Sequence, residues 1–104
     1  MTIQAKVAKK ANKPSSTAGR RRVRFEVEAE PGSQVSLVGS FNDWDEKSHP
    51  LSEKKPGLFV KLVYLHTEKY EYKFVINGDW VADSNCPTYE PNEFGTLNSV
   101  LTVQ

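Results

Sequence analysis

The sequence of 104 residues is poor in the side chains that form cross-links and bind metals, with one cysteine and two histidines. Cys86 has no disulfide partner within the chain, and we expect it to be structurally indifferent. With His49 and His66 as the only imidazoles, no cluster has the ligand spacing of a zinc site. The sequence predicts neither a metal nor a cofactor.

Long apolar runs are also missing. No segment approaches the roughly 18 consecutive apolar residues of a transmembrane helix. The first residues lack the apolar stretch of a secretory signal. A hydrophobic fraction of 38% in a chain of this length suits one small domain. We therefore expect a soluble, cytoplasmic protein that makes no membrane contact.

Acidic residues are absent from residues 1–24, which carry eight lysines and arginines. The rest of the chain carries six lysines and thirteen acidic residues, so the net charge of +1 combines +8 with −7. Residues 1–21 join this one-signed charge to low hydrophobicity and a Pro-Ser-Ser-Thr-Ala-Gly run, which predicts a disordered basic tail. A solvated tail is favoured over a transit peptide or a contact for an acidic partner. Nucleic acid is not expected as that partner, because no aromatic residue stands in the tail for base stacking.

From residue 22 onward apolar and polar residues alternate, which is the pattern of half-buried β-strands. Asn77-Gly78 is a strong hairpin signal, and Trp80 would begin the returning strand. No window has a sustained helical period. Six or seven short strands between Gly, Pro and Asn turns predict an antiparallel, immunoglobulin-like β-sandwich over residues 22–104. The strands are expected near residues 23–27, 35–38, 58–65 and 70–76, followed by the returning strand that begins at Trp80 and a last strand near residues 97–103.

Carboxylates in the predicted loops raise the question of a glycosidase, which needs one carboxyl group in an apolar pocket and an ionised partner. These carboxylates stand beside Pro, Gly and Asn, where acidic side chains commonly bond the local backbone. The sequence also lacks a nucleophile elbow and a phosphate-binding glycine loop. We therefore predict no catalysis. The carboxylates considered are Asp43, Asp45, Asp83, Glu90 and Glu93.

The two tryptophans are more informative, because both stand at predicted strand ends, where loops carry function. Trp44 lies in the polar segment SFNDWDEKS, and Trp80 follows the hairpin turn. An exposed indole offers a flat apolar surface, and the C–H face of a glucose ring fits such a surface. Lys73, on the polar face of its strand, and Asn98, near the start of the last strand, could bond sugar hydroxyls at the edge. The alternative is that one or both tryptophans cap the core.

Three segments, VSLVGSFNDW, YEYKFVINGDWVAD and FGTLNSVLTV, resemble in order and spacing the glycogen-binding domain of the AMP-activated protein kinase β subunit. More broadly they resemble carbohydrate-binding module family 48, found before the catalytic domains of isoamylases and branching enzymes. The resemblance spans residues 22–104. It implies an early-set immunoglobulin-like sandwich that binds α-1,4-linked glucans such as glycogen or starch without catalysis.

Carried over motif by motif, the resemblance also assigns the site. Phe94 is the one departure, because the family has leucine where this chain reads FGTLN. In the kinase-type domain that leucine protrudes into the curved glucan, whereas a phenyl ring is expected to stack beside the chain. The expected carbohydrate-binding residues are Trp44, Lys73, Trp80, Phe94, Thr96 and Asn98.

A second interpretation is a structural or protein-docking module, associated with an amylolytic enzyme or a kinase complex, whose glucan surface is unused. The joint presence of both tryptophans with the polar residues of the motif argues against a purely structural role. The expected partner is therefore an α-glucan polysaccharide, with an amylolytic enzyme or a kinase subunit as a further candidate.

Overall fold

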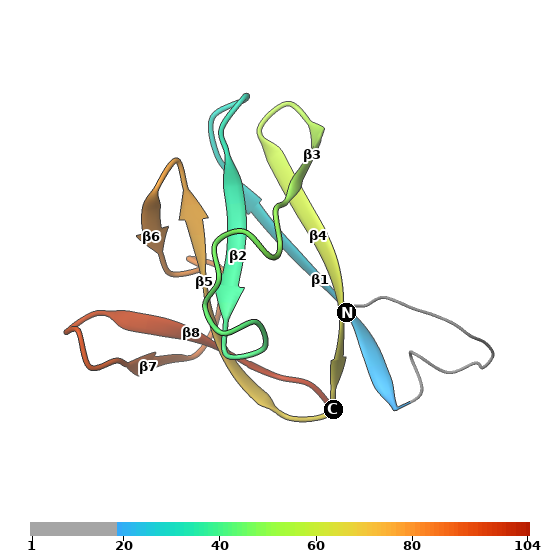
Figure 1. The fold of residues 1–104 in the computed structure, drawn as a ribbon, viewed down its shortest axis with the longest axis vertical. Helices are drawn as coiled ribbons and strands as arrows, with labels where there is room; N and C mark the ends of the chain where they lie inside the picture. Colours follow the sequence, from blue (N-terminus) through green and yellow to red (C-terminus); the bar gives the residue numbers. More distant parts are fainter. Residues whose placement is uncertain (1–18) are drawn as a thin grey trace.

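The computed structural model of the protein describes residues 19–104, which form an all-β fold (Figure 1). Most of the predicted basic tail, residues 1–18, lies outside the described residues. None of residues 19–104 is helical, so none forms a helix that could cross a membrane. The strands are β1 (Arg20–Glu28), β2 (Val35–Gly39), β3 (Ser52–Lys55), β4 (Leu58–His66), β5 (Lys69–Ile76), β6 (Asp79–Val81), β7 (Tyr89–Pro91) and β8 (Leu97–Thr102).

The strands form two antiparallel sheets. One has the order β1-β4-β3, and the other has the order β2-β5-β8-β7, with β6 paired to the C-terminal half of β5. Alternate residues of both sheets face one shared hydrophobic core, which includes Phe25, Phe59, Leu37 and Phe74. The predicted β-sandwich is thus confirmed.

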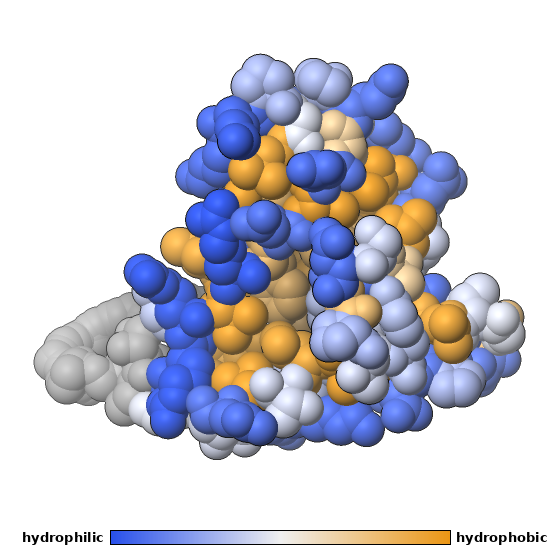
Figure 2. Space-filling view, turned by 180° about the vertical axis from the view of Figure 1, so that it is seen from behind, coloured by the Kyte–Doolittle hydropathy of each residue, from blue (hydrophilic) through white to orange (hydrophobic). Residues whose placement is uncertain are grey.

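Apolar surface remains exposed outside the buried core. In the view from behind, apolar residues remain visible across the middle of the face, between hydrophilic ones (Figure 2). Several large apolar side chains are exposed, in keeping with a small domain that has too little polar surface to cover itself. These side chains belong to Leu62, Tyr64, Trp80, Val81, Phe94 and Leu97.

Two strands were not predicted, and one begins earlier than predicted. β3 is exposed throughout and β7 has only three residues, so neither shows an apolar alternation in the sequence. β1 begins at Arg20, although the tail was predicted to extend through residue 21. Arg20 pairs with His66, and the Arg21 Nε donates to the Gln104 carbonyl oxygen at 3.2 Å. The β1–β4 pairing extends to Arg20 because β4 still offers a backbone partner at His66. This pairing does not depend on apolar side chains in β1.

β5 is the central strand of the larger sheet, pairing with β2 along one edge and with β8 and β6 along the other. Tyr70, Tyr72 and Phe74 face the core. Because side chains alternate along a strand, Lys73 and Val75 face the opposite, outer side of the sheet. The elements that surround this outer face carry the candidate site.

At Gly39, the last residue of β2, neighbouring atoms lie too close for any side chain. A Cβ atom there would lie 2.7 Å from the Glu71 carbonyl oxygen and 2.7 Å from the Phe41 ring. The Ser40 amide donates to the same Glu71 oxygen at 2.9 Å. The chain can therefore turn out of β2 tightly against β5, which places the following loop over the outer face.

Candidate functional site

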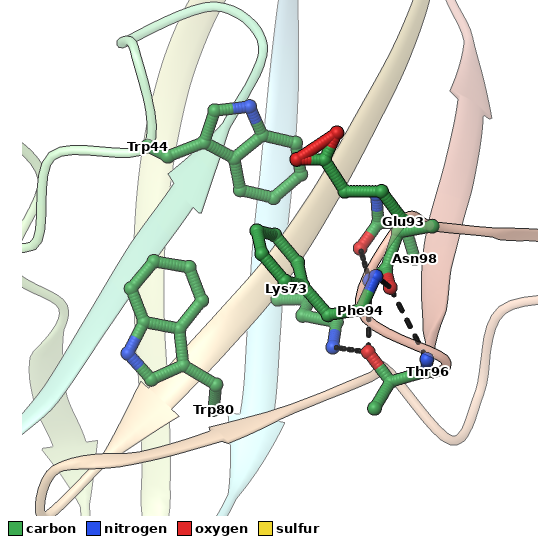
Figure 3. A pocket seen from close by; sticks show the side chains of 8 residues that line it. Trp44, Lys73, Trp80, Glu93, Phe94, Thr96 and Asn98 are labelled. Carbon is green, nitrogen blue, oxygen red and sulfur yellow. Dashed lines mark hydrogen bonds between the residues drawn. The ribbon is translucent and has the colours of Figure 1, made fainter.

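An open cleft of about 760 Å³ lies on the outer side of the larger sheet (Figure 3). Its side chains come from the β2–β3 connection, β5, β6, the β7–β8 loop and β8. All six residues expected from the sequence line it, together with two that were not expected. The lining residues are Trp44, Lys73, Trp80, Asn92, Glu93, Phe94, Thr96 and Asn98.

The two indoles form one wall of the cleft. Their ring centroids lie 6.4 Å apart and their planes differ by 21°. Parallel aromatic pairs with centroids at roughly 4.5 to 7 Å are offset sideways, and Figure 3 shows the rings of Trp44 and Trp80 without overlap. Trp80 is 42% exposed, so it is not a core residue. The pair therefore presents an extended, nearly continuous aromatic surface.

Trp44 is held by the backbone of its loop. Asp43 and Trp44 both have positive φ, at 57° and 58°, in the left-handed region that non-glycine residues seldom adopt. Such conformations cost about 1 to 3 kcal/mol each and persist where other contacts enforce them. The Trp44 amide donates to the Gly39 carbonyl oxygen at 3.0 Å. The loop thus turns the indole back toward the sheet.

The Asn42 side chain supplies the other contacts that fix this loop. Its Oδ1 accepts from the Gly39 amide at 3.0 Å, and its Nδ2 donates to the Leu37 carbonyl oxygen at 3.0 Å. Both bonds tie the loop to the end of β2. Asn42 is a positioning residue, and sequence reasoning did not assign it a role.

Trp80 is placed by the β5–β6 hairpin. Asn77 and Gly78 both have positive φ, at 50° and 90°, as a two-residue type I′ turn requires. Trp80 then lies directly across from Val75, so the two side chains share the outer face. The predicted hairpin is confirmed, although Trp80 is the middle residue of β6 and not its first.

Lys73 faces outward as predicted but is only 7% exposed, so it lies at the base of the cleft and not at an open edge. Its Nζ donates to the Thr96 Oγ1 at 2.9 Å. The Asn92 Nδ2 donates to the same oxygen at 2.8 Å. With both acceptor positions of Thr96 engaged, its hydroxyl proton remains available to donate.

Asn92 organises the β7–β8 loop and was missed by sequence reasoning. Its Oδ1 accepts from the amides of Phe94 and Thr96, at 2.9 and 3.1 Å. Its Nδ2 donates to the Asn98 Oδ1 at 3.0 Å. The signal that could have revealed it is an Asn two residues before Phe94 in a Gly-containing turn, where Asn side chains bond the backbone.

Asn98 is also buried, at 7% exposed, and its Nδ2 donates to the Glu71 Oε1 at 2.9 Å. Phe94 is the opposite case: it is 81% exposed at the tip of its loop and lies beside the indoles in Figure 3. Glu93 precedes it and borders the cleft. The site thus combines an aromatic surface with a rigid polar floor.

The other loop carboxylates give no catalytic arrangement among residues 19–104. Asp83 Oδ2 accepts from the Tyr72 hydroxyl at 2.6 Å, so this carboxylate anchors its own segment. Burial, and then this bond, raises the pKa of the Tyr72 hydroxyl.

No group of three or more potential metal ligands occurs in the described residues. The Cys86 thiol contacts the Thr88 and Val100 carbonyl oxygens, both at 3.2 Å.

Comparison with known proteins shows which family this chain resembles. Residues 21–104 match the family described as the glycogen recognition site of AMP-activated protein kinase, which is a non-catalytic carbohydrate-binding module. The chain is 34% identical over 92 residues to the 5'-AMP-activated protein kinase subunit beta-2 of Mus musculus and of Homo sapiens, covering 88% of this chain and 32% of theirs. It is 33% identical over 73 residues to subunit beta-1 of Sus scrofa, covering 70% of this chain and 57% of that one. The chain therefore spans about a third of the beta-2 subunits.

His49 makes a contact with the Trp44 loop that depends on its protonation state. Its Nδ1 lies 2.9 Å from the Asn42 Nδ2. The Ser48 Oγ lies 2.6 Å from the same nitrogen. The backbone bonds of Asn42 direct its NH2 group toward the ring, so a proton on Nδ1 would oppose this contact and the neutral imidazole is favoured. Burial, and then the Lys61 ammonium, lowers the pKa of His49 below its ordinary 6.5, while Asp45 acts in the opposite direction.

We expect this histidine to make stability fall in mild acid. Because the folded pKa is depressed, the contribution is complete above the unfolded value of 6.5 and is lost as the pH falls through the folded value. The measurement is Tm at about pH 7.5 and about pH 5.5, an interval that spans the ordinary histidine pKa. His49→Gln, which keeps an acceptor, should show a smaller drop in Tm than the wild type.

His66→Gln is the control for this prediction, because His66 is exposed and does not contact the Trp44 loop. Its pH dependence should match that of the wild type. Equal drops in Tm for the wild type and His49→Gln would contradict the role assigned to His49.

Proposed function

Because the chain belongs to the family of the glycogen recognition site of AMP-activated protein kinase, we propose that it binds α-1,4-linked glucans such as glycogen and starch. The observation that carries the proposal is the pair of nearly parallel indoles, the half-buried Trp44 and the exposed Trp80, along an open cleft. Each indole can hold the apolar C–H face of a glucose ring. Stacking there would leave the ring hydroxyls directed toward the polar floor.

The polar floor suits these hydroxyls because it is rich in free donors. Lys73 has three N–H donors and gives one to Thr96. The Thr96 hydroxyl proton is free, since its oxygen already accepts two bonds. Hydroxyl oxygens of a sugar would accept from these groups. The hydrogen bonds of Asn92 and Asn98 hold the donors in place before the ligand arrives, which lowers the entropy cost of binding.

The shape of the site favours a curved glucan over a flat one. The indole planes are inclined by 21°. Trp44 belongs to the β2–β3 connection and Trp80 to β6, and Phe94 projects from the β7–β8 loop. An α-1,4-linked chain curves, whereas a β-1,4-linked chain is a flat ribbon. We therefore expect amylose and glycogen to bind, and cellulose not to bind.

The expected affinity for one short chain is low. Stacking of a flat ligand on an aromatic ring contributes roughly 1 to 3 kcal/mol in the nucleic-acid analogue, and each solvent-competed hydrogen bond about 1 kcal/mol. After ordering costs, about 5 to 6 kcal/mol remains, which corresponds to a Kd on the order of 100 µM. Glycogen presents many chain ends, so multivalency would raise the effective affinity.

We also propose that the domain works within a kinase complex and brings it to glycogen. The support is that the relatives reported above are kinase β subunits. A docking module with an unused glucan site is the competing function. The two differ in tryptophan fluorescence, because only the glucan-binding function predicts a change in emission when maltoheptaose is added.

Trp80→Ala should weaken binding of maltoheptaose by about tenfold or more, the effect of losing one stacking ring. Its fold should survive, because Trp80 lies on a short edge strand and is 42% exposed. Isothermal titration measures the affinity, and native gels with and without glycogen show the effect on the polymer. Tyr64→Ala is the matched control, since Tyr64 is 46% exposed but lies on the other sheet.

An unchanged affinity in Trp80→Ala would contradict the stacking role. A loss of several kcal/mol in stability, as for a truncated core aromatic, would show instead that this indole caps the core. Equal retention of the wild type by cellulose and amylose would contradict the proposed preference for α-linked chains.

Phe94 should favour linear over cyclic glucans. A phenyl ring gains most by lying parallel to a sugar face, and Phe94 is exposed enough to do so. Wild-type protein should bind maltoheptaose at least as well as β-cyclodextrin, and Phe94→Leu should shift the preference toward the cyclic ligand by roughly 1 kcal/mol. Isothermal titration of both ligands against both proteins tests this. A tenfold or greater wild-type preference for the ring would show that the phenyl group acts as a leucine does.

A further inference from the structure

A second cleft, of about 500 Å³, adjoins the first and shares Trp44 with it. It lies between the loop after Trp44 and the neighbouring parts of β2, β5 and the β5–β6 turn. No residue expected from the sequence, other than Trp44, belongs to it. Its lining residues are Gln34, Ser36, Trp44, Asp45, Glu46, Lys47, Val75 and Gly78.

Strand register places the two clefts in succession along β5. Lys73 lines the first cleft and Val75 lines the second, and the two residues face the same side of the sheet. Ser36 pairs with Val75 on one edge of β5, and Trp80 pairs with Val75 on the other. The second cleft therefore begins where the indole pair ends, on the same outer face.

The chemistry of the second cleft suits a neutral ligand rich in hydroxyl groups. None of the hydrogen bonds and ion pairs found within residues 19–104 uses the side chains of Gln34, Ser36 or Lys47, and the same holds for Glu46. These groups offer amide, hydroxyl, ammonium and carboxylate partners above the apolar Val75. Two carboxylates and one ammonium leave no excess of positive charge, which disfavours a phosphate-bearing ligand.

We propose that the second cleft binds further glucose units of the same α-1,4-glucan chain that lies on the indoles. This inference rests on the proposed function and extends it from a two-ring platform to a longer subsite row. The chain would pass from the floor of Lys73 and Thr96, over Trp80 and Trp44, to Gln34 and Lys47. The domain would then favour long unbranched stretches over short chain ends.

The test compares a short glucan with a long one in two double variants. Gln34→Ala/Lys47→Ala removes two free polar groups of the second cleft. Lys54→Ala/Gln104→Ala removes the same two kinds of group from exposed positions outside both clefts. Isothermal titration with maltotetraose and with maltodecaose gives four affinities for comparison with the wild type. Tm should not change in either variant, because none of these side chains makes a hydrogen bond within the described residues.

We expect the cleft variant to bind maltotetraose as the wild type does and maltodecaose about fivefold more weakly, the size of one net hydrogen bond. The control variant should match the wild type for both ligands. A long chain has more registers available on any site, but that advantage is the same in all three proteins. The loss specific to maltodecaose therefore reports the second cleft.

A second measurement needs no substitution. The backbone amide resonances of Gly78 and Lys47 should shift when maltodecaose is added and stay unchanged with maltotetraose. Equal maltodecaose affinities in the wild type and the cleft variant, with normal binding of maltotetraose, would overturn the second subsite alone. Failure of the wild type to bind maltotetraose at all would overturn the proposed function and this inference with it.

Discussion

Backbone pairing along both edges of β5 is the constraint on which the rest of the molecule depends. Its inward side chains, Tyr72 and Phe74 among them, fill the core, and its outward Lys73 forms the floor of the cleft. β2, β6 and β8 are all registered against it, and each leads to or carries part of the site. Stability and binding geometry are therefore set by the same hydrogen-bond ladders.

Two asparagines extend this rigidity from the sheet into the loops. Asn42 bonds the backbone at the end of β2 and holds Trp44, while Asn92 bonds the loop that carries Phe94 and Thr96. Loops fixed in this way lose little entropy when a ligand binds. A weak ligand such as a glucan chain needs such preparation, because each glucose ring offers only one apolar face and competes with water for every hydrogen bond.

Sequence patterns predicted the sandwich and most strands well, because apolar alternation and the Asn77-Gly78 turn are local signals. β3 and β7 escaped prediction, since an exposed strand such as SEKK pairs only because β4 is already in place. The family resemblance named six residues, and all of them line one cleft. It did not indicate Asn42, Asn92 or the second cleft, whose roles depend on contacts made after folding.

By itself, the sequence determined the fold class, the absence of a metal-ligand cluster with zinc spacing, and the kinds of side chain available for binding, because these follow from composition and short-range pattern. Only the tertiary structure decided that Trp44 and Trp80 lie 6.4 Å apart and nearly parallel. Only the fold buried Lys73 and Asn98 beneath that surface. The physical reason is that Trp44 and Trp80, 36 positions apart in the chain, are brought together by the pairing of β2 and β6 with β5 and by the strained loop at Asp43 and Trp44. That meeting depends on segments that are distant in the sequence.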